Sequence, residues 1–171
     1  MCIRDSPKTL DDYIGQKHLV GQGAVLRKMI DAGRVPSFIL WGPPGVGKTT
    51  LAQIIANKLD APFYTLSAIS SGVKDVREVI EKAKSNRFFN TVSPILFIDE
   101  IHRFSKSQQD SLLNAVETGV VTLIGATTEN PSFEVIRPLL SRCQVYVLKS
   151  LDKNDLLTLL HKACLLYTSP S

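Results

Sequence analysis

The chain has 171 residues, of which 44% are hydrophobic and 21% are charged, and its mean hydropathy is close to zero at +0.07. These values predict a soluble globular domain with a sizeable core, and no apolar run approaches the roughly 20 residues that a membrane span requires. The net charge of +4 permits nucleic-acid binding without requiring it. The cysteines Cys2, Cys143 and Cys164 lack the spacing of a metal site or a disulfide framework, so we expect a cytoplasmic protein without membrane contact.

The two ends do not continue the patterns of their neighbours. Residues 1–6, MCIRDS, and 164–171, CLLYTSPS, resemble translated adapter scars joined to a natural sequence. We therefore leave both ends out of the fold prediction. The remaining chain divides into one domain over residues 7–150 and the start of a further helical unit over residues 151–163.

Between these ends, apolar runs typical of strands alternate with helical periodicity. Strands are expected at 38–41, 63–66, 95–98, 121–127 and 145–148. Helices are expected at 48–59, around 76–83, at 107–118 and 132–140, and from Asp152 onward. The apolar run at 95–98 has no polar face, which is typical of a parallel strand covered on both sides. The alternation predicts an α/β fold, with a five-stranded parallel sheet and helices on both faces.

A glycine-rich loop lies between the first expected strand and the helix at 48–59. It satisfies GxxxxGK[ST] with Gly42, Pro43, Pro44, Gly45, Val46, Gly47, Lys48 and Thr49, and Thr50 follows. Glycines let backbone N–H groups turn toward phosphates, and the N-terminus of the helix adds positive potential. Lys48 would bridge the β- and γ-phosphates of a nucleotide, and the Thr49 hydroxyl would bind Mg²⁺. A turn that merely caps a helix needs no Lys-Thr pair at this position.

Two carboxylates, Asp99 and Glu100, follow the most apolar expected strand. Ligands of open α/β sheets bind at the carboxyl ends of the strands, which is where these side chains emerge. Asp99 is the expected magnesium partner, and Glu100 is expected to orient and deprotonate the attacking water. An acidic pair after a strand is by itself more often a solvated strand end. Together with the phosphate loop, however, it favours a catalytic site.

Polar residues also end the strand expected at 121–127. Thr128, which is close to the strand end, and Asn130, from its spacing to the segment around Arg142, are alternative sensors of the γ-phosphate or of the attacking water, with a slight preference for Thr128. A turn rich in Thr and Asn explains the same residues equally well. His18 and His102 lack a paired carboxylate or metal-like spacing, so they are expected to be solvated or part of the core.

The combined motifs resemble the AAA+ family of ATPases. More narrowly, the segments LDDYIGQKHLVG, GPPGVGKTT, ILFIDEIHRF, GATTENPSFE and LLSRC are similar to the replication-associated recombination protein A group, which is related to clamp loaders and to the Holliday-junction branch-migration motor. The resemblance extends from residue 7 to residue 163. DEIHRF with TTENPSFE is specific to that group, whereas the phosphate loop is shared by very many ATPases.

The resemblance implies binding and hydrolysis of ATP with Mg²⁺. In the full-length protein it implies DNA remodelling at stalled replication forks, with DNA forks or junctions and single-strand-binding protein as partners, in a homo-oligomer that is nucleoid-associated in bacteria. It implies that Ile14, Gly15 and Gln16 lie near the adenine, and that Arg142 is an arginine finger for a neighbouring subunit. A clamp-loader-like or branch-migration-motor-like nucleotide switch is the alternative function, and a fragment that folds without turnover is the third possibility. Family members continue through a helical lid, whose first helix would be residues 151–163.

Overall fold

The computed structural model of this chain describes residues 9–10, 13, 15–87 and 92–168. Within these residues, one parallel sheet has the strand order β2-β3-β4-β1-β5. Its strands are β1 (Phe38–Trp41), β2 (Phe63–Ser67), β3 (Ile95–Asp99), β4 (Thr122–Thr127) and β5 (Gln144–Val147). Every pairing between neighbouring strands is parallel. The predicted α/β fold with a five-stranded parallel sheet is confirmed.

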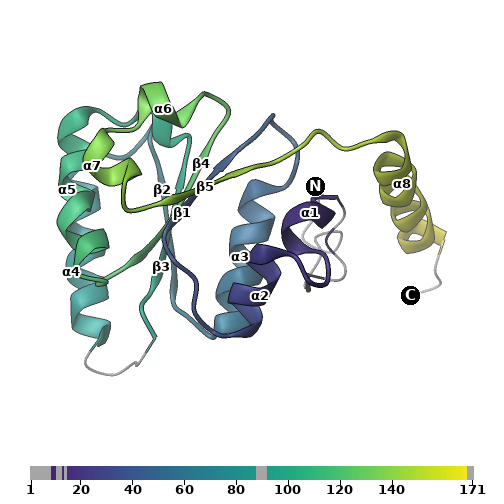
Figure 1. Ribbon diagram of the computed structural model, residues 1–171, viewed down its shortest axis with the longest axis horizontal. Helices are drawn as coiled ribbons and strands as arrows, with labels where there is room; N and C mark the ends of the chain where they lie inside the picture. The colour runs from purple at the N-terminus through teal and green to yellow at the C-terminus, as the bar shows by residue number, and fades with distance from the viewer. Residues whose placement is uncertain (1–8, 11–12, 14, 88–91, 169–171) are drawn as a thin grey trace.

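Helices cover both faces of the sheet (Figure 1). One face carries α1 (Lys17–Val20), α2 (Val25–Asp31) and α3 (Lys48–Leu59), and the other carries α4 (Val73–Arg87) and α5 (Lys106–Glu117). Two hydrophobic cores result, because successive residues of a strand point to opposite faces. Phe38 and Leu40 of β1 pack into the core beneath α3, whereas Ile39 packs into the core beneath α5.

The strand order places β4 between β1 and β3. In the sheet register, Trp41 at the end of β1 lies beside Thr127 of β4, and Ile98 of β3 lies beside Gly125 of β4. The carboxyl ends of three neighbouring strands therefore form one edge. After β3 the chain forms a short 3₁₀ helix, η2 (Ile101–Arg103), which the sequence did not predict. A side chain at Gly125 would have its Cβ only 3.1 Å from Ile101, so the glycine makes room for η2 to fold back over β4.

The helix expected at 132–140 is wrong as a single element, because two short helices, α6 (Pro131–Glu134) and α7 (Arg137–Leu140), occupy the segment. Pro138 has no N–H group to donate to the carbonyl of Glu134, as a continuous helix would require. The buried Gln109 side chain replaces that bond. Its amide donates to the Glu134 carbonyl at 3.0 Å, and its oxygen accepts from the Ile136 N–H at 2.8 Å. This packing decides the local structure, and the segment's own periodicity does not reveal it.

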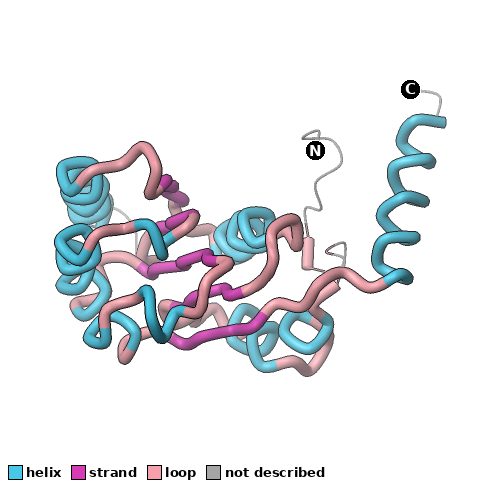
Figure 2. The backbone as a smooth tube through the Cα atoms, turned by 90° about the horizontal axis from the view of Figure 1, so that it is seen from above, coloured by secondary structure: helices cyan, strands magenta, loops and turns pink. Residues whose placement is uncertain are grey.

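The last helix, α8 (Lys153–Thr168), stands apart from the sheet, and the segment after β5 connects it to the domain (Figures 1 and 2). Leu156, Leu157 and Leu160 on this helix are 50–63% exposed. The helix continues through residue 164, where the sequence suggested a foreign tail, and residues 1–6 lie outside the described part of the chain. The domain boundaries drawn from the sequence stay predictions. In the part of the chain that the structure describes, no helix has the length and apolar character to cross a membrane.

The core on the α5 face supplies a direct test of the packing. Leu112 of α5 is fully buried, so we expect Leu112→Ala to lower the free energy of unfolding by about 2–5 kcal/mol, through lost apolar burial and the cavity left behind. The matched control is Leu157→Ala, because Leu157 is 53% exposed and should change that free energy by no more than about 0.5 kcal/mol. Urea unfolding followed by circular dichroism measures both. Equal effects of the two substitutions would contradict the assigned core.

Candidate functional site

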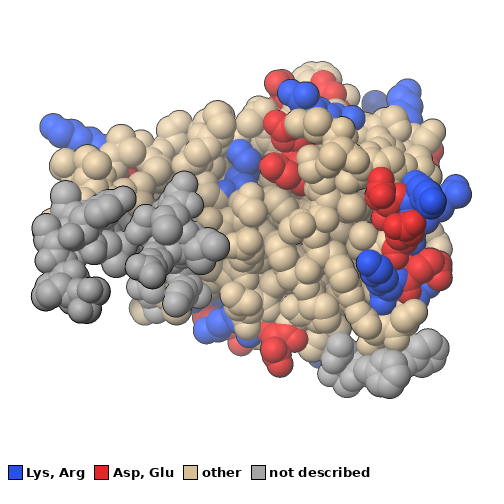
Figure 3. All heavy atoms as spheres, turned by 180° about the vertical axis from the view of Figure 1, so that it is seen from behind, with Lys and Arg blue, Asp and Glu red and all other residues tan. Residues whose placement is uncertain are grey.

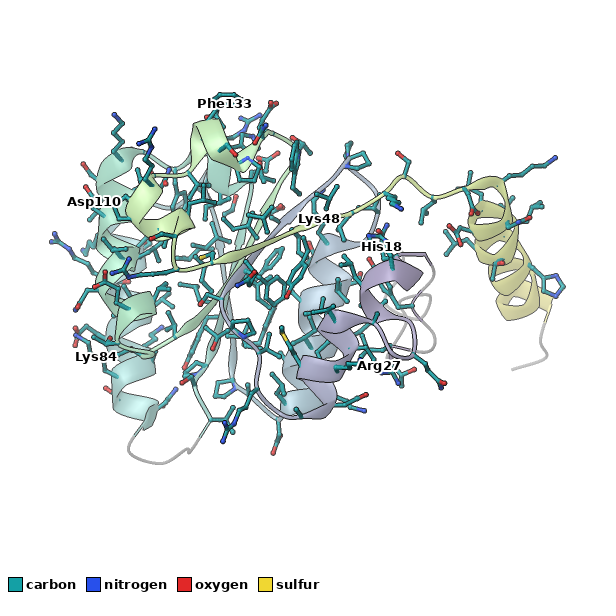
Figure 4. The ribbon with its side chains drawn as sticks, viewed as in Figure 1. His18, Arg27, Lys48, Lys84, Asp110 and Phe133 are labelled. Atoms are coloured by element: carbon teal, nitrogen blue, oxygen red, sulfur yellow. The ribbon has the colours of Figure 1, made fainter. Side chains whose placement is uncertain are left out.

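The phosphate loop occupies the turn between β1 and α3, as the sequence predicted (Figure 4). Gly47, the residue before α3, has φ of 86°, a left-handed conformation that favours glycine. The Lys48 ammonium group donates to the backbone carbonyls of Gly42 and Pro43 at 2.8 and 2.9 Å. Burial lowers the pKa of Lys48, and the negative charge of Asp99 opposes that shift. The lysine is therefore held over the loop by groups that a phosphate can replace.

The loop also packs closely against the end of β5. A Cβ on Gly42 would lie 2.7 Å from the Leu148 Cβ and 3.0 Å from the Leu148 carbonyl oxygen. The Leu148 N–H in turn donates to the Trp41 carbonyl at 2.7 Å. Only glycine fits at this position. The start of the phosphate loop is thereby fixed against the segment that leads to α8.

Asp99 and Glu100 lie at the same edge of the sheet. Asp99 ends β3 with an exposed side chain, and its charge acts on Lys48. Glu100 has φ of 54°, which is uncommon for a residue with a side chain, and it directly precedes η2. Its carboxylate forms an ion pair with Arg103 at 3.4 Å, in which both side chains are partly exposed. The predicted grouping of the acidic pair with the phosphate loop is thus present in the structure.

A histidine connects these residues to the end of β4. The Nδ1 atom of His102 in η2 lies 2.9 Å from the Thr127 hydroxyl, and that hydroxyl also accepts from the Glu129 N–H at 2.9 Å. Thr127 is 1% exposed, so its hydroxyl needs partners within the protein, and the contact with His102 links η2 to β4. The sequence interpretation left His102 as a solvated or core residue. Only the pairing of β3 with β4 reveals that it follows Glu100 into contact with the strand end.

The two sensor candidates have different surroundings. The Asn130 side chain accepts from the Ser132 N–H at 3.0 Å and caps α6. Thr128 is exposed directly after β4, the strand that separates β1 from β3. The structure therefore gives Asn130 a local structural role, whereas Thr128 is an exposed residue at the edge that carries the phosphate loop. This difference supports Thr128 as the better candidate.

The segment before α1 joins the loop to the linker after β5. The Gln16 side chain, which is 5% exposed, donates to the Lys149 carbonyl at 2.6 Å and accepts from the Lys149 N–H at 2.8 Å. A Cβ on Gly15 would lie 2.8 Å from the Leu151 side chain. Ile14 lies outside the described residues. The adenine contacts expected of Ile14, Gly15 and Gln16 stay a prediction. Their neighbour Tyr13, which no motif singled out, contacts the phosphate loop directly.

Arg142 is not brought together with these residues. It precedes β5, whose first residue Gln144 lies beside Phe38 at the start of β1. Arg142 therefore lies at the amino ends of the strands, opposite the carboxyl ends that carry the phosphate loop. Its guanidinium pairs with Glu117 at the end of α5, at 2.6 Å, and also donates to the Pro138 carbonyl at 3.2 Å. Its side chain is 43% exposed. This placement separates Arg142 from the phosphate loop by the length of the strands.

The residues at the carboxyl ends of the strands are suited to bind a nucleotide together with Mg²⁺. Magnesium in nucleotide sites is held by one or two protein oxygens together with phosphates and water. Thr49, exposed in the first turn of α3, and Asp99 are of the kind required. Among the described residues, no group of three or more His, Cys, Asp or Glu side chains forms a metal site of its own.

Comparison with known proteins agrees with this arrangement. The sequence model of the ATPase family associated with various cellular activities (AAA) matches residues 38–151. The chain belongs to this family. It is 54% identical over 157 residues to the replication-associated recombination protein A of Haemophilus influenzae and 52% identical over 163 residues to that of Escherichia coli K12. These matches cover 92% and 95% of this chain and 35% and 36% of the relatives, so the chain spans about a third of their length.

A eukaryotic relative and a solved structure extend the comparison. The chain is 53% identical to the ATPase WRNIP1 of Dictyostelium discoideum, over 91% of this chain and 18% of that protein. The Thermotoga maritima RuvB Holliday junction branch migration motor superposes with a TM-score of 0.77 at 31% identity, over 95% of this chain and 55% of that one. The chain is thus an AAA domain that is similar over nearly all of its length to replication-associated recombination protein A, and its fold resembles that of RuvB.

The close contact between the phosphate loop and β5 predicts the effect of a single methyl group. Gly42→Ala should lower the free energy of unfolding by about 1–3 kcal/mol, because the new Cβ forces the loop and Leu148 apart. Gly72→Ala is the matched control, since the nearest atom to a Cβ there is 3.8 Å away and no change beyond about 0.5 kcal/mol is expected. Denaturant titration compares them. A Gly42→Ala protein as stable as the control would show that the loop is not fixed in this way.

Proposed function

We propose that this domain binds ATP with Mg²⁺ and hydrolyses it. The observation that carries this proposal is the shared edge of the sheet. The phosphate loop after β1, the strand end of β4 and the acidic pair after β3 are neighbours, and the charge of Asp99 reaches Lys48. Membership of the AAA family supports the same chemistry.

Each residue at the edge has a distinct part in the proposed reaction. Lys48 exchanges its carbonyl partners in the loop for oxygens of the β- and γ-phosphates and offsets their charge. Thr49 and Asp99 hold Mg²⁺, which adds further positive charge against the phosphates. Glu100 accepts the proton of the attacking water, a role in which its present partner Arg103 must give way. Thr128 orients that water or senses the γ-phosphate.

In the full-length protein, we propose that ATP hydrolysis drives DNA remodelling at stalled replication forks. The names of the recombination-associated relatives and of the branch migration motor support DNA as the partner. A homo-oligomer is proposed as the working state. Figure 3 shows one face on which the described Lys and Arg side chains are interspersed with Asp and Glu, so this face offers no extended basic patch. DNA contacts are therefore assigned to other surfaces or to regions beyond this chain, and single-strand-binding protein is proposed as a further partner.

Arg142 completes the proposal as an arginine finger for a neighbouring subunit. Its position at the opposite edge of the sheet prevents it from reaching its own nucleotide, while its exposure leaves it accessible to a second copy. The finger would exchange its ion pair with Glu117 for the γ-phosphate of the neighbour. A nucleotide switch of the clamp-loader kind uses the same residues. The switch differs in how the nucleotide is coupled to function. ATP binding would change the partners that the protein binds, and hydrolysis would only return the protein to its starting state.

Substitution of the phosphate-loop lysine tests nucleotide binding. Lys48→Ala removes a positive charge from the phosphates, so we expect no measurable binding of Mg-ATP by calorimetry while the circular dichroism spectrum stays that of the unsubstituted chain. Lys58→Ala, at the other end of the same helix, is the matched control and should bind normally. Undiminished binding by the Lys48→Ala chain would remove the loop from the proposed site.

Mixing two inactive variants tests whether Arg142 acts across a subunit interface. Both variants are made in a full-length protein, as long as the relatives. Arg142→Ala subunits keep Glu100, and Glu100→Gln subunits keep Arg142, so only mixed interfaces contain both groups. Each protein alone should bind ATP but lose hydrolysis, by about a thousandfold or more for Arg142→Ala. Steady-state phosphate release should return on mixing, whereas Arg137→Ala, a nearby exposed arginine of α7, should be active alone. Mixed oligomers that form but stay inactive would contradict the role of Arg142 as a finger.

A further inference from the structure

A buried tyrosine lies behind the phosphate loop. Tyr13 is 8% exposed, and its hydroxyl donates to the Val46 carbonyl at 2.7 Å. The Gly47 carbonyl lies 3.1 Å from the same hydroxyl and takes a weaker share of the bond. Burial raises the pKa of Tyr13 well above its usual value, so the hydroxyl keeps its proton and remains a donor at neutral pH. Residues far apart in the sequence therefore meet at the last turn of the loop.

These contacts fix the direction of two peptide units. In a trans peptide the C=O and the following N–H are coplanar and point in opposite directions, and the described chain contains no cis peptide. With the Val46 carbonyl held toward Tyr13, the Gly47 N–H must point to the other side of the loop. The Gly47 carbonyl applies the same constraint to the Lys48 N–H. Two successive N–H groups that point to one side form an anion-binding concavity.

The two carbonyls differ in their need for the tyrosine. The Gly47 carbonyl accepts from the Leu51 N–H at 2.9 Å, within the first turn of α3, so it has a partner without Tyr13. The Val46 residue is 5% exposed and precedes the helix, where the helix supplies no donor to its carbonyl. Loss of the hydroxyl would leave a buried acceptor unpaired, and rotation of the peptide between Val46 and Gly47 would relieve it.

The tyrosine ring supports the same conformation. A Cβ on Gly47 would lie 3.1 Å from the Tyr13 hydroxyl oxygen and 3.2 Å from a ring carbon. The ring thus occupies the space in which a side chain at position 47 would stand, and it packs against the left-handed turn from outside. Hydroxyl and ring act together, because one orients the peptide and the other supports the turn.

We propose that Tyr13 is a positioning residue for phosphate binding, which holds the Gly47 and Lys48 N–H groups toward the β-phosphate of the nucleotide. The inference deepens the proposed ATPase function and rests on it. Tyr13 does not touch the nucleotide. It acts through the Val46 and Gly47 carbonyls, so that the loop is arranged for an anion before the anion arrives and little of the binding free energy is spent on ordering it.

Removal of the hydroxyl alone is the sharpest test, because Tyr13→Phe keeps the ring against Gly47. We expect the Kd of Mg-ADP, measured by calorimetry, to rise about tenfold, as the loss of one buried hydrogen bond and of a preformed loop predicts. The affinity for adenosine, measured by saturation-transfer NMR, should stay within about twofold, since adenosine has no phosphate. Tyr146→Phe is the matched control, because its hydroxyl contacts Met29 at 3.7 Å, away from the loop.

The outcomes separate the inference from the function on which it rests. If the unsubstituted chain binds no Mg-ADP, the proposed function fails, and the inference fails with it. If it binds but Tyr13→Phe has an unchanged Kd for ADP, or loses ADP and adenosine equally, the positioning role alone is overturned. A second measurement serves if Tyr13→Phe does not fold. In the unsubstituted chain, the Gly47 and Lys48 amide proton signals should move downfield on addition of Mg-ADP, and unmoved signals would overturn the proposal.

Discussion

A loop that turns its N–H groups toward an anion must turn its carbonyl groups the other way, and those carbonyls then need donors of their own. In this chain the donors come from two places. The Lys48 ammonium group takes the carbonyls of Gly42 and Pro43, and the Tyr13 hydroxyl takes that of Val46. The loop conformation therefore depends on a helix residue and on a segment before the first strand. The tyrosine lies outside the glycine-rich loop, whereas Lys48 is part of its motif.

The two kinds of donor differ in what a phosphate would do to them. Lys48 is partly exposed and can exchange its carbonyl partners for phosphate oxygens, whereas Tyr13 is buried and its hydroxyl is held between the Val46 and Gly47 carbonyls. The contacts of Lys48 at the start of the loop can thus change when a phosphate binds, whereas the contact of Tyr13 at the end of the loop is fixed. The packing of Gly42 on Leu148 and the bonds from Gln16 to Lys149 extend this fixed part to the linker before α8. The loop and the linker consequently form one connected structure.

The sequence predicts those structural features that are encoded within a short segment of the chain. The phosphate loop, the acidic pair and the strands follow from motif and periodicity, because each is specified within about ten residues. Features that depend on distant partners escaped prediction. The break between α6 and α7 needs Gln109, the role of His102 needs the pairing of β3 with β4, and the contact of Tyr13 joins residues 33 positions apart. The sensor choice was open for the same reason, since Asn130 is distinguished from Thr128 only by the cap that it forms on α6.

The parallel sheet also separates the proposed chemistry into two halves. All strands run in one direction, so the phosphate loop, Asp99 and Glu100 gather at the carboxyl edge while Arg142 stays at the amino edge. No motion that keeps the sheet intact brings the two edges of one domain together. An arginine at the amino edge can serve a nucleotide only when a second copy presents that edge to the first. In the proposed assembly, the ion pair of Arg142 with Glu117 would hold the guanidinium in the free subunit until a stronger anion, such as the neighbour's γ-phosphate, competes for it.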